Sequence, residues 1–287
     1  MHINYWREVK RDNFGRIGII IFIVLVLLAV LAPLLTGYRP GTYTGSIFKP
    51  PSAQYWLGTN DVGQDIWTHL LYGTRTSLTV GCGVALLSAV FSLLIGGTAA
   101  LFGGYYDRIV MRLVDALIVI PPVIIVILAA AYLKPNLFLL ILLLSLLIWP
   151  GGARIIRAQT LVLKDRMHVK AARTFGAGWL HLLSRHIVPD FGPVLIAVMI
   201  QDARRAVFME AGLSFLGISD PAMLSWGIMI QHALKFTYLN VWQWWLLPPG
   251  FALSLTIMSL TFMGFALEKI LDPRLRKQEE GEKHVKH

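Results

Sequence analysis

Four charged residues stand inside a long apolar stretch and are the first candidates for chemistry. The stretch covers residues 192–218 and contains Asp202, Arg204, Arg205 and Glu210. Asp202 and Arg205 are three positions apart, so on a helix they share a face and can form an ion pair. If the stretch crosses a membrane, each charge costs at least about 2.5 to 3.5 kcal/mol and must face protein or water. We interpret the four residues as the lining of a polar cavity, with a structural ion-pair network as the alternative.

No pattern in the sequence predicts catalysis or metal binding. Cys82 is the only cysteine, which excludes an intramolecular disulfide or a cysteine metal site. The eight histidines include no HExxH or similar ligand spacing, and no P-loop for nucleotide phosphates occurs. A nucleophile-elbow sequence of the G-x-S-x-G type is also missing. We therefore expect no catalytic residue, no metal site and no cofactor bound by this chain.

A polar, basic segment at residues 154–190 separates two hydrophobic stretches. Residues 169–175 include good helix formers, Gly176 and Gly178 favour a turn, and residues 179–186 can form a second short helix. A membrane protein rarely keeps such an ordered loop unless the loop binds something. The sequence therefore predicts a helix and turn with a binding role.

Small side chains give this segment a surface that a partner can approach closely. They are Ala171, Ala172 and Gly176, next to the charged Lys170. Pro189 ends the segment and starts the next hydrophobic helix, where its missing N–H costs little. The alternative is an amphipathic loop that lies on the lipid headgroups.

The elements that position these residues are membrane-spanning helices. Of the 287 residues, 56% are hydrophobic and only 15% are charged, a composition beyond that of soluble domains. A span needs roughly 17 to 25 apolar residues. Six stretches meet this length, so we expect an all-α, polytopic membrane protein with spans at residues 17–35, 77–102, 109–133, 137–153, 192–218 and 244–267.

Basic residues set the expected orientation, because Lys and Arg near the spans are retained in the cytoplasm. With the N-terminus inside, the cytoplasmic segments contain nineteen of the 26 Lys and Arg residues and the external segments five. Both termini are therefore expected in the cytoplasm. The net charge of +10 then lies mostly beside the anionic inner leaflet, which favours contact with membrane lipid over nucleic acid.

This topology divides the chain into four parts. They are a cytoplasmic N-terminal tail at residues 1–16, the first span with an extracellular loop at 17–76, a five-helix core at 77–270 with its cytoplasmic loop at about 154–190, and a cytoplasmic C-terminal tail at 271–287.

Two further patterns concern packing. Ser88, Ser92, Gly96 and Ala100 recur every four residues in the second span, and such a stripe allows close helix approach. We favour packing within the chain over a contact between subunits. The long external stretch at residues 37–76 is rich in aromatic residues and is expected to fold over the external mouth. The alternative for any single Tyr or Trp is a position in the aromatic belt at the headgroups.

The segment Lys170-Ala-Ala-Arg-Thr-Phe-Gly176, followed by Arg185-His-Ile-Val-Pro189, resembles the "EAA" signature of permease subunits in binding-protein-dependent ABC importers. Lys170 replaces the Glu of that signature. Trp56-Leu-Gly-Thr-Asn-Asp-Val-Gly-Gln-Asp65 and Leu70-Leu-Tyr-Gly-Thr-Arg75-Thr-Ser-Leu78 are similar to the C-type permease of the dipeptide, oligopeptide and nickel importers. Asn60, Gln64 and His69 depart from the usual Asp, Arg and Arg.

The resemblance implies a type I ABC importer fold in which different subunits have different roles. The loop would couple to a separate ATPase through Lys170, Ala171, Ala172, Gly176, His186 and Pro189. The charged residues of the fifth span would lie on the translocation path, and Trp56, Gly58 and Asp65 at the extracellular mouth. The implied partners are a second permease, two ATPase subunits that bind ATP and Mg, and an extracytoplasmic substrate-binding protein.

The resemblance places the chain in the plasma (inner) membrane of a prokaryote, as a non-catalytic subunit for peptides, with nickel complexes or oligosaccharides as other cargoes. A self-contained channel or secondary transporter is the alternative function, and a polytopic membrane enzyme is a third. A secondary transporter would be supported by inverted repeats, and we find no convincing internal repeat.

Overall fold

The computed structural model describes residues 12–133, 136–220 and 222–271, and their regular structure is helical. Within these described residues, five helical stretches are long and apolar enough to cross a membrane, or six if a bent pair of helices is one span. The principal helices are α2 (Asn13–Leu35), α3 (Ile66–Phe102), α4 (Gly104–Val119), α5 (Pro122–Leu133), α6 (Leu137–Leu163), α9 (Val188–Phe215) and α12 (Leu247–Leu271). The predicted all-α membrane fold is thus confirmed.

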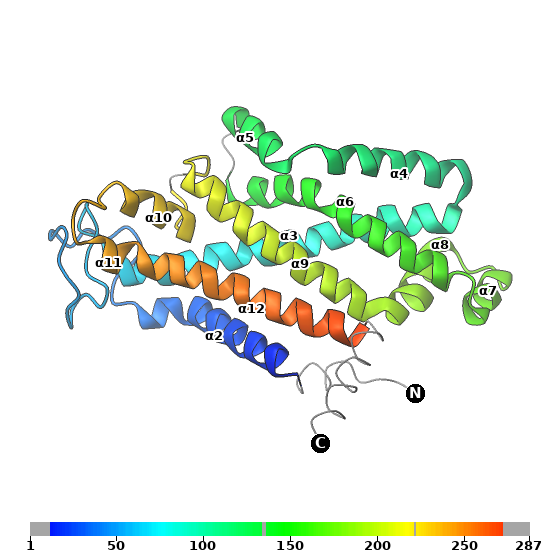
Figure 1. Ribbon diagram of the computed structural model, residues 1–287, viewed down its shortest axis with the longest axis horizontal. Helices are drawn as coiled ribbons and strands as arrows, with labels where there is room; N and C mark the ends of the chain where they lie inside the picture. The colour runs from blue at the N-terminus through cyan, green and yellow to red at the C-terminus, as the bar shows by residue number, and fades with distance from the viewer. Residues whose placement is uncertain (1–11, 134–135, 221, 272–287) are drawn as a thin grey trace, which may run out of the picture.

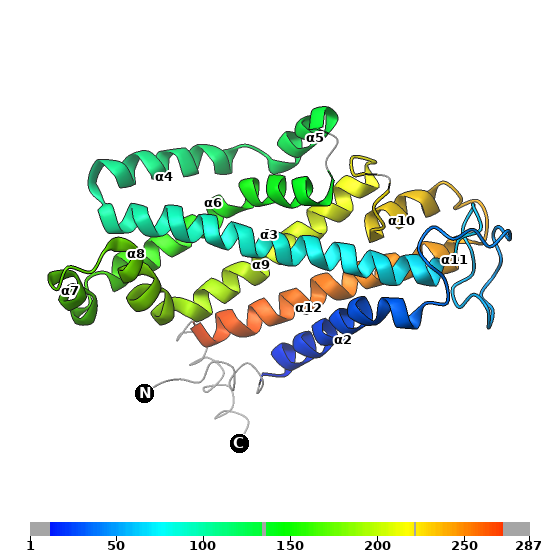
Figure 2. The same cartoon turned by 180° about the vertical axis from the view of Figure 1, so that it is seen from behind.

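The helices form an elongated bundle (Figures 1 and 2). In both views α2 and α12 lie side by side along one edge, α4 and α5 lie along the other, and α3, α6 and α9 lie between them. One end of the bundle carries α7 (Met167–Thr174) and α8 (Trp179–His181). The opposite end carries α10 (Trp226–Leu234), α11 (Trp242–Trp245) and the irregular segment 36–65.

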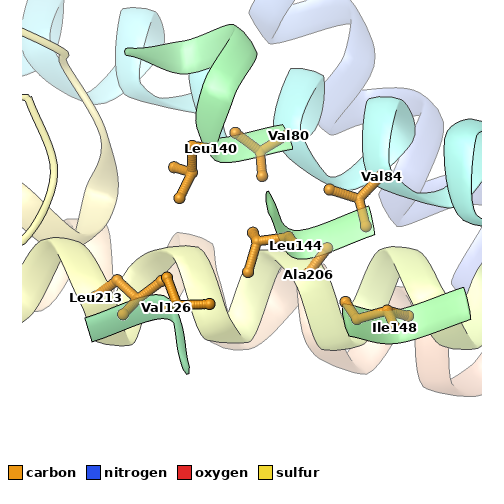
Figure 3. Close-up of a cluster of buried hydrophobic side chains, with 8 residues drawn as sticks. All are labelled: Val80, Val84, Val126, Leu140, Leu144, Ile148, Ala206 and Leu213. Atoms are coloured by element: carbon orange, nitrogen blue, oxygen red, sulfur yellow. The ribbon is translucent and has the colours of Figure 1, made fainter. Parts of the chain in front are cut away.

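A hydrophobic cluster joins four of the helices in the middle of the bundle. Figure 3 shows its members: Val80 and Val84 of α3, Val126 of α5, Leu140, Leu144 and Ile148 of α6, and Ala206 and Leu213 of α9. All eight side chains are buried. The cluster therefore fixes α5 to the bundle although α5 is a separate short helix.

The small-residue stripe of α3 packs against α6, as predicted for packing within the chain. Ser92 donates a hydrogen bond from its Oγ to the backbone carbonyl of Trp149, at 2.8 Å. A Cβ added at Gly96 would collide with the carbonyl oxygen of Ala153, and one at Gly152 would lie 2.6 Å from Ser92 Oγ. This close approach needs small residues on both helices.

Helix α6 continues through Pro150 and past Ala153, the predicted end of this span. The helix continues to Leu163, and Arg154 and Arg157 belong to it rather than to the loop. Contacts of the 149–153 region with α3 and α9 hold the backbone helical where Pro and Gly alone would weaken it.

Helix α3 begins eleven residues before the predicted span. Asp65 accepts hydrogen bonds from the backbone N–H and the hydroxyl of Thr68, at 2.8 and 2.7 Å, and so caps the helix at Ile66. The external loop predicted at 37–76 therefore ends at Asp65.

The span predicted at 109–133 is two helices bent by 79° at residues 120–121. Pro121 and Pro122 lie at the break, where their lack of N–H groups interrupts the helical hydrogen bonds. The other predicted spans differ from α2, α9 and α12 by a few residues at their ends.

Asp12 and Lys269 join the start of α2 to the end of α12. Asp12 caps α2, because its Oδ2 accepts a hydrogen bond from the backbone N–H of Gly15 at 3.0 Å. Lys269 Nζ lies 2.9 Å from Oδ1 of the same carboxylate. This junction lies toward the end of the bundle that carries α7 (Figure 1). Most of the two predicted tails, residues 1–11 and 272–287, lies outside the described residues.

Candidate functional site

Helix α7 projects from one end of the bundle and is held there by a hydrophobic cluster (Figure 1). Val169 is buried at the centre of its inner face. The cluster is Ile156 and Leu163 of α6, Val169 of α7, Leu182, Leu183 and Ile187 of the π-helix that follows α8, and Phe191 of α9. Helix α7 thus shares one hydrophobic cluster with α6, the π-helix and α9.

The predicted helix and turn are present. α7 covers Met167–Thr174, and Gly176 has φ of +84°, a left-handed conformation that glycine adopts without strain. The predicted second short helix is not separate: α8 continues through π-helical turns, Leu182–Ile187, into α9. Pro189 lies in the first turn of α9, as expected.

The outer face of α7 differs from the predicted small-residue surface. Ala171 and Gly176 are exposed, but Ala172 packs against the hydrophobic cluster and does not belong to the outer face. Two large side chains project instead: Phe175, which is 90% exposed, and Met167, which is 86% exposed. An apolar side chain in a polar, basic loop was the signal that sequence reasoning missed.

Charged groups brace this end of the bundle. Lys170 forms an exposed ion pair with Asp165 at 3.0 Å, and Arg166 reaches Asp190 at 3.2 Å across the base of the loop. His186 is half-buried on the π-helix, and its ring centroid lies 5.5 Å from that of His181. It is therefore beside the base of α7 and not on its exposed outer face.

Two arginines of α6 hold α4 in place. Arg157 makes a two-pronged interaction with Asp107, through bonds of 2.5 and 2.6 Å. Arg154 donates from both Nε, at 3.0 Å, and Nη2 to a single oxygen of Asp115, Oδ1. These contacts connect the bent pair to the helix that leads into α7.

The two acidic residues of α9 are buried against serines. Glu210 accepts hydrogen bonds from Ser77 Oγ at 3.1 Å and Ser214 Oγ at 2.7 Å. Asp202 accepts one from Ser88 Oγ at 2.8 Å. Both carboxyl groups face α3, so protein hydroxyls compensate part of their burial. Ser214 lies four residues after Glu210 on α9, whereas the contacts of Ser77 and Ser88 with α9 depend on the tertiary fold and were not predicted from the sequence.

The two arginines of α9 point elsewhere. Arg204 donates a hydrogen bond from Nη1 to Thr261 Oγ1 of α12, at 3.3 Å. The side chain of Arg205 is 52% exposed. The predicted ion pair of Asp202 and Arg205 is at the distance limit for such a pair, because Arg205 Nη1 lies 4.0 Å from Asp202 Oδ1. The four charged residues therefore do not form one cluster, and Arg205 alone is exposed in the isolated chain.

The three residues predicted at the mouth have different environments. Trp56 is exposed and its ring centroid lies 5.4 Å from that of Trp67. Gly58 has φ of +74° and lies so close to Lys49 and Trp244 that a Cβ would not fit. Asp65 is the buried cap of α3. Gly58 and Asp65 thus shape segment 36–65, while Trp56 presents an exposed side chain.

The three departures from the family pattern converge in one cavity at this end. Asn60, Gln64 and His69 all line a cavity of about 400 Å³, between segment 36–65, the start of α3 and α10. Asp61 and His232 line it as well. The folding of segment 36–65 places Asn60 and Gln64 in the same cavity wall as His69 of α3 and His232 of α10.

No group of three or more His, Cys, Asp or Glu side chains within residues 12–133, 136–220 and 222–271 is arranged to hold a metal ion. The charged and aromatic groups described above offer binding surfaces and a polar cavity.

Comparison with known proteins agrees with this architecture. Residues 90–277 match the family described as binding-protein-dependent transport system inner membrane component. Residues 4–51 match the N-terminal transmembrane domain of oligopeptide transport permease C.

Individual relatives match along nearly the whole chain. A putative peptide transport system permease of Brucella abortus is 37% identical over 95% of this chain and 92% of its own length. The dipeptide transport system permease protein DppC of Bacillus subtilis is 34% identical over 95% of this chain and 85% of its own. The oligopeptide transport system permease protein OppC of the same organism is 34% identical over 96% of this chain and 92% of its own length. The chain is therefore a member of the family of inner membrane components of binding-protein-dependent transport systems, a multi-pass membrane permease.

Proposed function

We propose that the chain is the transmembrane permease subunit of an ATP-driven peptide importer and forms half of its translocation pathway. Its relatives are named as permeases of peptide, dipeptide and oligopeptide transport systems, and they align with almost its full length. Nickel complexes and oligosaccharides remain other candidates for the cargo, which a separate binding protein selects.

The exposed outer face of α7 is the observation that carries this proposal. Phe175 and Met167 project from a helix whose inner face is packed into α6 and α9. Large exposed apolar side chains on a firmly held helix are typical of a protein interface. We assign this face to the ATPase subunits, which bind ATP and Mg; Lys170, Ala171 and Gly176 lie on the same exposed segment.

The mechanism uses the rigid link between α7 and the spans. When the ATPase subunits close on ATP, α7 moves with them, and the cluster around Val169 transfers this motion to α6 and α9. A change in the tilt of these two helices would switch the cavity between the two permeases from inward to outward access. This requires a second permease subunit and an extracytoplasmic binding protein that delivers the substrate.

The orientation follows from the same assignment. The end that carries α7, the start of α2 and the end of α12 would be cytoplasmic, in agreement with the distribution of Lys and Arg. Segment 36–65, α10 and α11 would then face the outside of the inner membrane.

A self-contained channel or secondary transporter is the alternative, and it would need no ATPase. Co-purification separates the two functions. The ATPase subunits should be retained on a tagged wild-type chain and lost with Phe175→Ala, while Tyr238→Ala should retain them. Tyr238 is a suitable control because it is 78% exposed and lies at the opposite end, between α10 and α11. Equal retention by both variants would contradict the proposed interface.

The substitution Ala172→Asp would be a poor test of the same interface. Ala172 packs against the hydrophobic cluster, so a buried carboxylate there would disturb folding. Ala171→Asp places the same charge on the exposed face and is the informative variant.

A further inference from the structure

The outer face of α4 carries two arginines that do not take part in the packing of the bundle. Helix α4 runs along one edge of the bundle and begins at the end that carries α7 (Figure 1). Its inner face packs through Val114 against Trp149 and Ala153 of α6. Arg108 and Arg112 are exposed on the opposite side of the helix.

The two aspartates of α4 do not balance the charge of these arginines. Asp107 and Asp115 both form ion pairs with arginines of α6. Within the part of the chain that the structure describes, neither Arg108 nor Arg112 forms an ion pair. The outer face of α4 is therefore cationic, with two guanidinium groups that an external anion can reach.

The spacing of the two arginines favours a shared anion. Arg108 and Arg112 are four residues apart, so they are neighbours on one face of the helix, and like charges at this spacing repel each other. An anion between the two side chains removes this repulsion. The planar guanidinium group matches the oxygens of a phosphate, which it can bind with two parallel hydrogen bonds. The face thus fits a phosphate group.

The position of the two arginines along α4 corresponds to the headgroup region of the membrane. At 1.5 Å per residue, Arg108 and Arg112 lie roughly 6 and 12 Å from the start of the helix at Gly104, and long basic side chains extend to the headgroups from such depths. Tyr105 is 80% exposed, and its ring centroid lies 5.4 Å from the guanidinium carbon of Arg108. Ile109, on the same face, is 59% exposed. Cations, an interfacial tyrosine and an apolar side chain are thus combined on one surface.

We propose that this face of α4 binds an anionic phospholipid of the cytoplasmic leaflet. The headgroup phosphate lies between Arg108 and Arg112, Tyr105 lies beside the headgroup, and an acyl chain covers Ile109. The charge of the face favours this occupant, because the cytoplasmic leaflet supplies anionic headgroups at the depth of the two arginines. The inference uses the orientation proposed above and is independent of the cargo.

Fluorescence quenching at Ile109 tests the proposal. In the Cys82→Ser chain, Ile109→Cys is labelled with bimane, and the complete permease–ATPase complex is reconstituted in phosphatidylcholine vesicles. The quencher is either phosphatidylglycerol or phosphatidylcholine with a doxyl group on its acyl chain. Both lipids contain a phosphate, but the choline cation offsets its charge. Doxyl phosphatidylglycerol should therefore reach half-maximal quenching at a mole fraction at least about tenfold lower than doxyl phosphatidylcholine.

Charge substitutions identify the residues responsible for this preference. Arg108→Gln combined with Arg112→Gln should abolish it, whereas Arg108→Lys combined with Arg112→Lys keeps both charges and should retain most of it. Arg16→Gln is the matched control. Arg16 is exposed at the same end of the bundle, donates to Asn13 of its own helix at 3.4 Å, and has no second arginine four residues away. This variant should be quenched like the wild type.

Equal quenching by the two lipids in the wild type, an unchanged preference in the double glutamine variant, or an equal loss of preference in Arg16→Gln would each overturn the lipid site. Failure of both lipids to quench would mean that another protein subunit covers the face, and would overturn it as well.

Peptide uptake by the same vesicles with the binding protein separates this failure from failure of the proposed function. If the wild type imports peptide but shows no lipid preference, only the lipid site is wrong. If it prefers the anionic lipid but imports no peptide, the proposed function is wrong and the lipid site stands.

Discussion

Arg157 of α6 and Asp107 of α4 form a two-pronged, half-buried ion pair, with Nε to Oδ1 at 2.5 Å and Nη2 to Oδ2 at 2.6 Å. The pair fixes the start of α4 to the helix that leads into α7. Arg157→Ala should lower the free energy of unfolding by about 1.5 to 3 kcal/mol, the usual value for hydrogen bonds to charged groups. Thermal unfolding in detergent measures this.

Arg154→Ala is the control for that experiment. Its pair with Asp115 joins the same two helices but is more exposed, so its loss should cost only about 0 to 1 kcal/mol. If both variants lost the same stability, burial of the Arg157 pair would not be the cause.

Glycine substitutions should distinguish the α3–α6 contact from open helix surface. Gly96→Ala places a methyl group against the carbonyl of Ala153 and should destabilise the protein by about 1 to 3 kcal/mol. Gly212→Ala meets no neighbouring atom and should be neutral or stabilise by up to about 1 kcal/mol, because alanine favours a helix. Melting temperatures of both variants test the contact, and a stable Gly96→Ala protein would contradict it.

Arg205→Ala should affect transport without affecting stability. The side chain is 52% exposed, and its contact with Asp202 is at the 4.0 Å limit, so truncation should change the free energy of unfolding by less than about 0.5 kcal/mol. If Arg205 faces the translocation path, substrate uptake should fall several-fold. Normal uptake by a fully assembled complex would remove Arg205 from the path.

Cysteine labelling tests the orientation. Cys82 is the only cysteine, so Cys82→Ser gives a cysteine-free chain into which single cysteines are introduced. A membrane-impermeant maleimide added to intact cells should label Tyr43→Cys and leave Phe175→Cys unlabelled until the membrane is opened. Both side chains are well exposed, so access to each depends on the side of the membrane. The reverse pattern would contradict the assigned topology.

Much of the fold could be predicted from the sequence because hydrocarbon thickness sets the length of a span. The left-handed turn at Gly176 and the small stripe of α3 also follow from local chemistry, and the structure confirms both. The early start of α3 had a local signal as well, since Asp65 stands three residues before Thr68 in the manner of a helix cap.

Other features depend on tertiary contacts and could not be derived from one sequence. Pro150 suggests a break, but packing of α6 on α3 keeps the helix intact. Ala172 faces inward because the cluster around Val169 determines which side of α7 is buried. The contact of Ser77 with Glu210 and the cavity around Asp61 combine residues whose proximity only the fold produces.

The most direct test of the proposed function is ATP-dependent peptide uptake into proteoliposomes that contain the complete importer. Phe175→Ala should reduce uptake at least about tenfold, because a large exposed anchor of the α7 interface is lost while the buried face of α7 is unchanged. Tyr238→Ala should leave uptake at the wild-type level. Full ATP-dependent uptake by Phe175→Ala would contradict coupling through this face of α7.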